Sequence, residues 1–238
     1  MNLQDLIIND KEVVDLEDVL LSRGNKQRVL QLIKEHKYVE ELHKYGLTVN
    51  NKILLHGNSG CGKTITAKAI ANALKKNLIT LNLSNVVSAR IGETSQNIRM
   101  VFEKAGKEKA ILFLDEFDQI GKARGNDEKD VGEMRRLVNS IIQLIDYYPK
   151  NALLISATNH VEVIDTALLR RFQLKMDFEM PSGDTLDKYY DKILSAFPNH
   201  LQSITRRYDV SFAEAKDYAH TVVKSMLIEE LEKQEIVP

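Results

Sequence analysis

The segment from residue 57 to residue 64, GNSGCGKT, constrains the fold of this chain more than any other part of the sequence. In a loop of this pattern, glycines let backbone N–H groups turn inward around nucleotide phosphates. The apolar run 53–55 precedes the segment, and apolar residues at helical spacing follow it over 67–74. The sequence therefore predicts a strand, a phosphate-binding loop and a helix whose N-terminus faces the phosphates.

Each side chain at the end of this loop has an expected role. Lys63 would reach the β- and γ-phosphates, and the hydroxyl of Thr64 would bind Mg²⁺. The residues expected to contact the nucleotide are Gly57, Asn58, Ser59, Gly60, Cys61, Gly62, Lys63 and Thr64. Taken alone, the loop indicates binding of a nucleoside triphosphate.

The composition is that of an ordinary globular protein. A net charge of −1 over 238 residues gives no bulk attraction to nucleic acid or to an acidic membrane. No stretch is apolar enough to span a bilayer, and residues 1–10 lack the pattern of a signal peptide. The one cysteine, Cys61, excludes an internal disulfide. These features predict a cytoplasmic protein without a membrane segment.

Strand and helix patterns alternate through most of the chain. Further strands are expected at 78–83, 110–114, 152–157 and 174–178, with helical spacing between them. Such alternation predicts an α/β fold, a P-loop NTPase parallel sheet flanked by helices, with ligands at the carboxyl ends of the strands.

After Pro181 the pattern changes, because no further strand follows. Two amphipathic helical patterns, 186–197 and 212–226, indicate a small C-terminal all-α lid domain. We therefore expect a large α/β nucleotide-binding domain over residues 1–179 and the helical lid over residues 180–238.

Two carboxylates end the third expected strand. Asp115 would hold the shell of Mg²⁺, and Glu116 would polarise the attacking water as a general base. Asn159 ends the next strand, where its amide could orient the same water. Because strand ends meet at one edge of a parallel sheet, this set predicts hydrolysis, with water as the acceptor, and disfavours a phosphotransfer kinase.

The order of these motifs resembles the AAA+ ATPases, and within them the AAA clade, over essentially the whole chain. The segment that ends at Val19 resembles the family's entry segment near the adenine, and residues 132–136 resemble the helix after the second pore loop. Arg170 and Arg171 match the arginine fingers, which reach the γ-phosphate held by a neighbouring subunit. The resemblance implies ATP and Mg²⁺ as cofactors and a homo-oligomeric ring, usually a hexamer. Either arginine could be the finger, since the two are adjacent.

The chain departs from the family's pattern at the first pore loop. Arg90 stands where protein-threading members carry an aromatic residue, and Ile91 keeps an apolar side chain beside it. We expect this loop to contact the protein on which the ATPase acts, its client, rather than the nucleotide. The alternative that Arg90 is an ordinary surface residue without such a role remains open. The lid has no evident nucleotide-sensing arginine at residues 211–214, as in the AAA clade.

Two functions of different classes follow. The first is ATP hydrolysis in a ring that remodels or delivers a client protein; by family analogy, a subtilisin-like serine peptidase is one candidate partner. The alternative is an ATP-controlled assembly switch or loader on DNA, which would use Arg90, Lys122 and Arg124. The near-neutral charge and the lack of a basic stripe count against the second.

Overall fold

The computed structural model describes residues 7–8, 12–84, 91–122 and 128–235; the side chains of 91–94, 121–122, 128–135 and 234–235 fall outside the description. The chain divides into two compact units. The sheet unit comprises Met1–Gly57 and Lys63–Asp177, and the helical unit comprises Asn58–Gly62 and Phe178–Pro238. No helix within the described ranges is long and apolar enough to cross a membrane.

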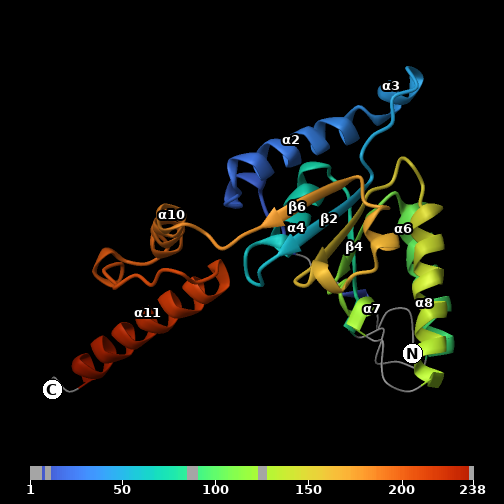
Figure 1. Cartoon of the computed structure of the whole chain (residues 1–238). Coiled ribbons are helices and arrows are strands. Elements are labelled where there is room, and N and C mark those ends of the chain that lie inside the picture. Colours follow the sequence, from blue (N-terminus) through green and yellow to red (C-terminus); the bar gives the residue numbers. More distant parts are fainter. Residues whose placement is uncertain (1–6, 9–11, 85–90, 123–127, 236–238) are drawn as a thin grey trace. The chain divides into compact units, whose positions relative to one another are not determined.

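Six strands form one sheet in the order β1-β3-β4-β5-β2-β6 (Figure 1). The strands are β1 Ile7–Ile8, β2 Lys52–Gly57, β3 Leu78–Asn82, β4 Ile111–Asp115, β5 Leu154–Thr158 and β6 Leu174–Phe178. The pairs β3–β4, β4–β5 and β5–β2 are parallel, whereas β1 pairs antiparallel with β3. The predicted α/β fold is confirmed, with the antiparallel edge strand β1 as an addition.

The register of the parallel strands determines which residues meet at the carboxyl edge. Asn82 of β3 lies opposite Asp115 of β4, and Ser156 of β5 lies opposite both Leu114 and Leu54. The ends of β2, β4 and β5, where the phosphate loop, the two carboxylates and the amide were expected, are therefore neighbours.

Helices cover the sheet. Those of the sheet unit are α2 Arg23–Lys37, α3 Val39–Lys44, α4 Lys63–Ala73, α6 Ile91–Glu108, α7 Gln119–Lys122, α8 Glu128–Asp146 and α9 Thr166–Leu169, with short 3-10 helices η1 Leu16–Asp18 and η2 Val161–Val163. Helices α6 and α8 run side by side (Figure 1), and their apolar faces pack on β3, β4 and β5 in the main core. The core holds the central strands rigid, which a site built from their ends requires.

The helical unit has its own core. Helices α10 Gly183–Leu194 and α11 Phe212–Glu235, with η3 Asn199–Leu201, enclose Leu186, Tyr190, Leu194, Leu201, Ala215, Ala219 and Val223. Helix α11 extends beyond the predicted 212–226, and Leu227, Ile228 and Leu231 near its end are exposed.

Candidate functional site

The phosphate loop leaves β2 at Gly57 and enters α4 at Lys63. Gly57, Gly60 and Gly62 have φ angles of 124°, 71° and 99°, which side chains rarely adopt. The loop therefore needs glycine at these positions. Asn58 and Ser59 are exposed at the tip, whereas Cys61 is buried, with its Sγ 3.6 Å from the Ser59 carbonyl oxygen.

Lys63 lies at the N-terminal end of α4 and is only 8% exposed. Its Nζ donates a 2.8 Å hydrogen bond to the carbonyl oxygen of Gly57. The ammonium group is thus held at the base of the loop, where a charged partner such as a phosphate could replace the carbonyl.

Thr64 and Asp115 bring two oxygen atoms together beside this loop. The Thr64 hydroxyl lies 3.5 Å from Oδ2 of Asp115. Burial raises the pKa of the Asp115 carboxyl, and the Glu116 N–H, the Lys63 ammonium and the Thr64 hydroxyl offset only part of that rise. A half-buried carboxylate beside a hydroxyl is the hard-oxygen donor set that suits Mg²⁺, so these two residues would hold the ion.

Glu116 follows Asp115 in an unusual backbone conformation. Its φ of 54° places a non-glycine residue in the left-handed region, at an energetic cost. Its N–H donates to Oδ1 of Asp115 at 2.9 Å, and its carboxylate accepts a hydrogen bond from the Ser84 hydroxyl. This turn separates the two carboxylates: Asp115 accepts hydrogen bonds beside the loop, and Glu116 reaches toward the end of β3.

Ser84 was not expected from the sequence. It lies 32 positions before Glu116 and just after β3, the strand that pairs with β4. A serine after a predicted strand carries no motif of its own, so only the pairing of β3 with β4 reveals its role.

Asp118 is a second unexpected residue. It is 2% exposed, and its Oδ1 accepts hydrogen bonds from the Thr158 hydroxyl at 2.9 Å and from the Asn159 N–H at 3.4 Å. The turn after β4 is thereby fastened to the end of β5, where the side chain of Asn159 is exposed. An aspartate two residues after Glu116 was the available signal.

The two adjacent arginines have different surroundings. Arg171 donates through Nε to Asp146 Oδ1 at 3.1 Å, through Nη2 to Oδ2 at 3.2 Å, and through Nη1 to the Ala167 carbonyl at 2.5 Å. Arg170 is exposed at the C-terminal end of α9. Arg171 is therefore used within its own chain, joining α9 to the end of α8.

Of the remaining predicted residues, the structure describes the side chain of Val19 but not those of Arg90, Ile91, Lys122 and Arg124. Val19 is 9% exposed and packs in a small cluster with Val14 and Ala69 of α4. Arg90 and Arg124 lie outside the described residues. Ile91 and Lys122 lie in helices α6 and α7, but their side chains are outside the description.

Comparison with known proteins identifies the family. The model of the family described as "ATPase family associated with various cellular activities (AAA)" matches residues 53–180, over half of the chain. This chain is an AAA family ATPase. The family predicted from the motifs is confirmed, and with it ATP binding. The residues that contact the nucleotide stay a prediction.

One curated relative of this AAA ATPase is the uncharacterized AAA family ATPase y4kL of Sinorhizobium fredii (strain NBRC 101917 / NGR234), 35% identical over 217 residues. The match covers 89% of this chain and 65% of that relative, so the chain spans about two thirds of its length. The crystal structure of the FIGL-1 AAA domain has the same fold, with a TM-score of 0.76 and 19% identity, over 98% of this chain and 80% of that one.

Proposed function

We propose that this AAA ATPase hydrolyses ATP with Mg²⁺ in a homo-oligomeric ring, and that the cycle remodels or delivers a client protein. The observation that carries the hydrolytic part is that Thr64, in the first turn of α4, lies beside Asp115 at the carboxyl end of β4, with Glu116 next in the chain. We propose the division expected above as well, a nucleotide-binding domain over residues 1–179 and a lid over residues 180–238. The sequence holds a single cysteine, Cys61, which supports a cytoplasmic location.

In the proposed reaction, each group of the sheet unit has one task. Mg²⁺, when held by Thr64 and Asp115, would neutralise charge on the phosphates. Lys63 would move its ammonium from the Gly57 carbonyl to the β- and γ-phosphates. Glu116 would accept the proton of the attacking water, with its carboxylate oriented by Ser84.

Asn159 would hold the same water from the end of β5. The backbone N–H of Asn159 donates to Asp118, which lies in the turn that carries Glu116. This bond holds the backbone of Asn159 in place relative to that turn. Geometry set by two neighbouring strand ends favours the near-attack arrangement of water and phosphorus.

We assign the finger that acts across subunits to Arg170. Its side chain is exposed, whereas the guanidinium of Arg171 is bound to Asp146 and Ala167 of its own chain. A finger supplied by a neighbour stabilises charge only in the assembled ring, so activity depends on assembly.

A mixing experiment tests this assignment. Lys63→Ala should lose ATP binding but keep its finger, and Arg170→Ala should keep binding but lose its finger. Each alone should be inactive, and the mixture should recover ATPase activity at mixed interfaces. Lys63→Ala mixed with Arg171→Ala is the matched control and should not recover, because Arg171 is needed within its own chain. If the first pair assembles together without recovery, the assignment of Arg170 is wrong.

The client half of the proposal is tested separately. An unfolded model protein should stimulate the ATPase, and duplex DNA should not. Stimulation by DNA with a steep salt dependence would instead favour the assembly switch on DNA. That alternative depended on Arg90, Lys122 and Arg124, whose side chains lie outside the described residues.

A further inference from the structure

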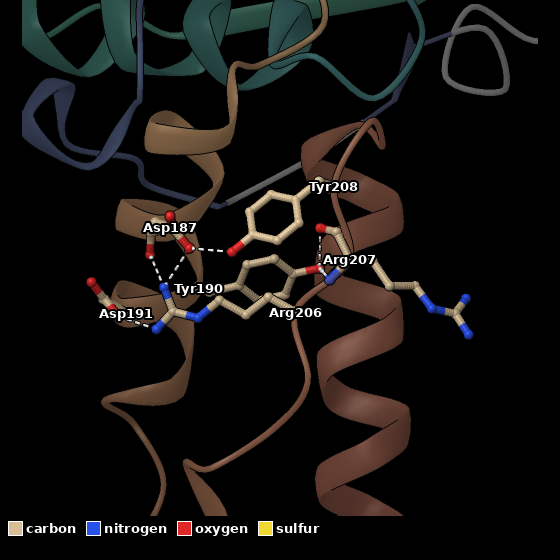
Figure 2. A network of polar contacts seen from close by, with 6 residues as sticks. All are labelled: Asp187, Tyr190, Asp191, Arg206, Arg207 and Tyr208. Carbon is tan, nitrogen blue, oxygen red and sulfur yellow. Dashed lines mark hydrogen bonds and ion pairs between the residues drawn. The ribbon is translucent and has the colours of Figure 1, made fainter.

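Three consecutive residues of the helical unit, 206–208, are hydrogen-bonded to helix α10 (Figure 2). Arg206 donates through Nη1 to Asp187 Oδ1 at 2.7 Å and through Nη2 to Asp191 Oδ1 at 2.5 Å. A further bond of 3.2 Å joins Nη1 to the backbone carbonyl of Asp187. The guanidinium lies 5.8 Å from the centre of the Tyr190 ring. One side chain thus joins two acidic residues one turn apart on the helix.

The next two residues are held to the same helix by other groups. The hydroxyl of Tyr190, a fully buried residue, donates to the Arg207 carbonyl at 3.1 Å and accepts from the Arg207 N–H at 3.2 Å. The Tyr208 hydroxyl donates to Asp187 Oδ1 at 2.9 Å. Hydrogen bonds from Arg206 and Tyr208 lower the pKa of the Asp187 carboxyl, which keeps it charged. The segment 206–208 therefore has little freedom to leave α10.

A tight bend connects this segment to the start of α11. Asp209 has a φ of 58°, in the left-handed region, and Ser211 follows two residues later. Ser211 and Glu214 form a reciprocal cap: the Ser211 N–H donates to Glu214 Oε2 at 2.8 Å, and the Glu214 N–H donates to the Ser211 hydroxyl at 3.3 Å. The position of the first turn of α11 is thus set by the pinned segment just before it.

This first turn lies against the tip of the phosphate loop. The Ala213 N–H donates to the Gly60 carbonyl at 3.3 Å. A Cβ atom on Gly60 would come within 2.6 Å of the Ser211 hydroxyl oxygen and 2.9 Å of the Ala213 Cβ. At the loop's start, the Asn58 N–H donates to the Phe178 carbonyl at 3.0 Å. Residues 58–62 accordingly belong to the same compact unit as α10 and α11.

We propose that Arg206 is a positioning residue for ATP binding: by pinning segment 206–208 to α10, it holds the first turn of α11 against Gly60 and keeps the phosphate loop in its binding shape. The proposal rests on the assignment of residues 57–64 as the phosphate loop. A loop whose N–H groups are already aimed binds phosphate without first being ordered. Arg206 itself does not touch the nucleotide in this proposal.

The chain offers a matched control in the neighbouring residue. Arg207 has the same charge and size, but its guanidinium lies 4.1 Å from the centre of the Tyr218 ring on α11. Figure 2 shows its side chain pointing away from the Asp187 cluster. The bonds between Tyr190 and Arg207 use only the backbone of Arg207, so Arg207→Ala retains them.

The test compares Arg206→Ala, Arg206→Lys and Arg207→Ala with the wild type in two assays. In hydrogen exchange without nucleotide, Arg206→Ala should speed exchange in peptides that cover 57–63, and Arg207→Ala should not. In ATP titrations with Mg²⁺, a loop that is binding-competent in only one fifth of the molecules lowers apparent affinity about fivefold. We expect a loss of that order for Arg206→Ala, with kcat at saturating ATP changed less than KM.

Arg206→Lys should recover part of the affinity, because an ammonium can reach one carboxylate but cannot bridge both. If Arg206→Ala folds poorly, Asp191→Asn removes only one of the two ion pairs and should shift both assays in the same direction by less.

Faster exchange in 202–210 with unchanged exchange in 57–63 and unchanged affinity would overturn the proposal. Equal losses in Arg207→Ala would also overturn it, since the effect would then be general loosening of the helical unit. If the wild type itself does not bind ATP, or if Lys63→Ala binds normally, the assignment of the loop fails instead.

Discussion

Glu116, the proposed general base, also has an unusual backbone conformation. Its left-handed φ of 54° and the bond from its N–H to Asp115 separate two adjacent carboxylates that would otherwise share one environment. Strained backbone at a single residue is retained when the surroundings hold it firmly, and such positions cluster at functional sites. Here the holding groups are Asp115 and Ser84.

Glu116→Gln should keep ATP binding and lose turnover. An amide preserves the shape and can still bond with Ser84, but it cannot accept the proton of water, so kcat should fall by about 10²- to 10⁴-fold. Single-turnover ATPase assays and ATP titrations measure the two properties separately. Ser84→Ala is the control, with a smaller loss of kcat because the carboxylate remains. Turnover in Glu116→Gln equal to wild type would remove Glu116 from the mechanism.

Asp118→Ala should reduce both stability and turnover. The change leaves the Thr158 hydroxyl and the Asn159 N–H without their acceptor, and an unsatisfied buried group costs about 1–3 kcal/mol. Denaturant unfolding measures this loss. Thr158→Val keeps the shape but removes the hydroxyl that donates to Asp118 and accepts from the His160 N–H, so it measures the part of the loss that depends on this hydroxyl. If Asp118→Ala keeps full kcat, then Asp118 does not position Asn159 for the reaction.

Residues in contiguous motifs could be predicted from the sequence, and their supporting residues could not. The pattern of residues 57–64 predicted a loop between a strand and a helix, and the Asp115-Glu116 pair predicted an acidic strand end; the structure has both. Ser84, Asp118 and Arg206 contact residues that are distant in the chain, and no local pattern encodes those contacts. The difference between Arg170 and Arg171 was likewise hidden, because it depends on Asp146 at the end of another helix.

At the scale of elements, the sequence predicted the long periodic segments and missed the breaks. The helical pattern of residues 26–45, followed by Gly46, predicts a single helix, but α2 ends at Lys37 and α3 begins at Val39. Tyr38, with φ −112° and ψ 24°, leaves the helical region there. Strand β1 contains only two residues and pairs antiparallel with β3, so no periodicity could have revealed it.

The end of α2 is fastened to the segment before β2. His36 Nε2 lies 2.8 Å from the Asn50 carbonyl oxygen, to which the neutral imidazole donates, and Glu35 Oε2 accepts from the Asn50 N–H at 3.2 Å. These bonds hold the last turn of α2, just before the break at Tyr38, to the segment that leads into β2. Burial of His36 lowers the pKa of its imidazole below 6.5, with the nearby Lys76 acting in the same direction and the Asn50 bond and Glu35 opposing it.

This packing predicts a loss of stability in mild acid. Below about pH 6.5 the unfolded chain takes up a proton on His36 while the folded chain resists it, so the free energy of unfolding falls as pH falls, by up to about 1.4 kcal/mol per pH unit from this group. Denaturant unfolding of wild type and His36→Gln between pH 5 and 7.5 measures the difference. The glutamine can donate to Asn50 without titrating, so its curve should be flatter. Parallel curves would show that His36 does not cause the dependence.

For the whole molecule, the family was the most predictable property, because the order of motifs along the chain indicated it. That order indicated the AAA family before any contact was known, and the match over residues 53–180 confirmed it. The client, the ring and any peptidase partner remain proposals, because their determinants lie on surfaces that the motif pattern does not describe.

Nucleotide should stabilise the whole chain only when the loop is intact. ATP with Mg²⁺ at 100 times its dissociation constant should raise the free energy of unfolding by about 2.7 kcal/mol, since the ligand binds only the folded state. Thermal unfolding of the catalytically slow Glu116→Gln variant, with Mg²⁺ or with a chelator, measures this gain without depleting ATP. Lys63→Ala should show little gain. A full gain in Lys63→Ala would place the nucleotide elsewhere.

The grouping of the loop tip with the helices bears on how proteins of this kind could be recombined. Residues 58–62 lie in the helical unit, while Gly57 and Lys63 on either side lie in the sheet unit. A lid exchanged between relatives by joining chains near residue 178 would leave the native Gly60 facing a foreign first turn of α11, where the fit leaves no room for even one extra carbon atom. We expect functional hybrids to need residues 58–62 replaced along with the lid. The two parts that must be exchanged together are therefore encoded by separate stretches of the gene.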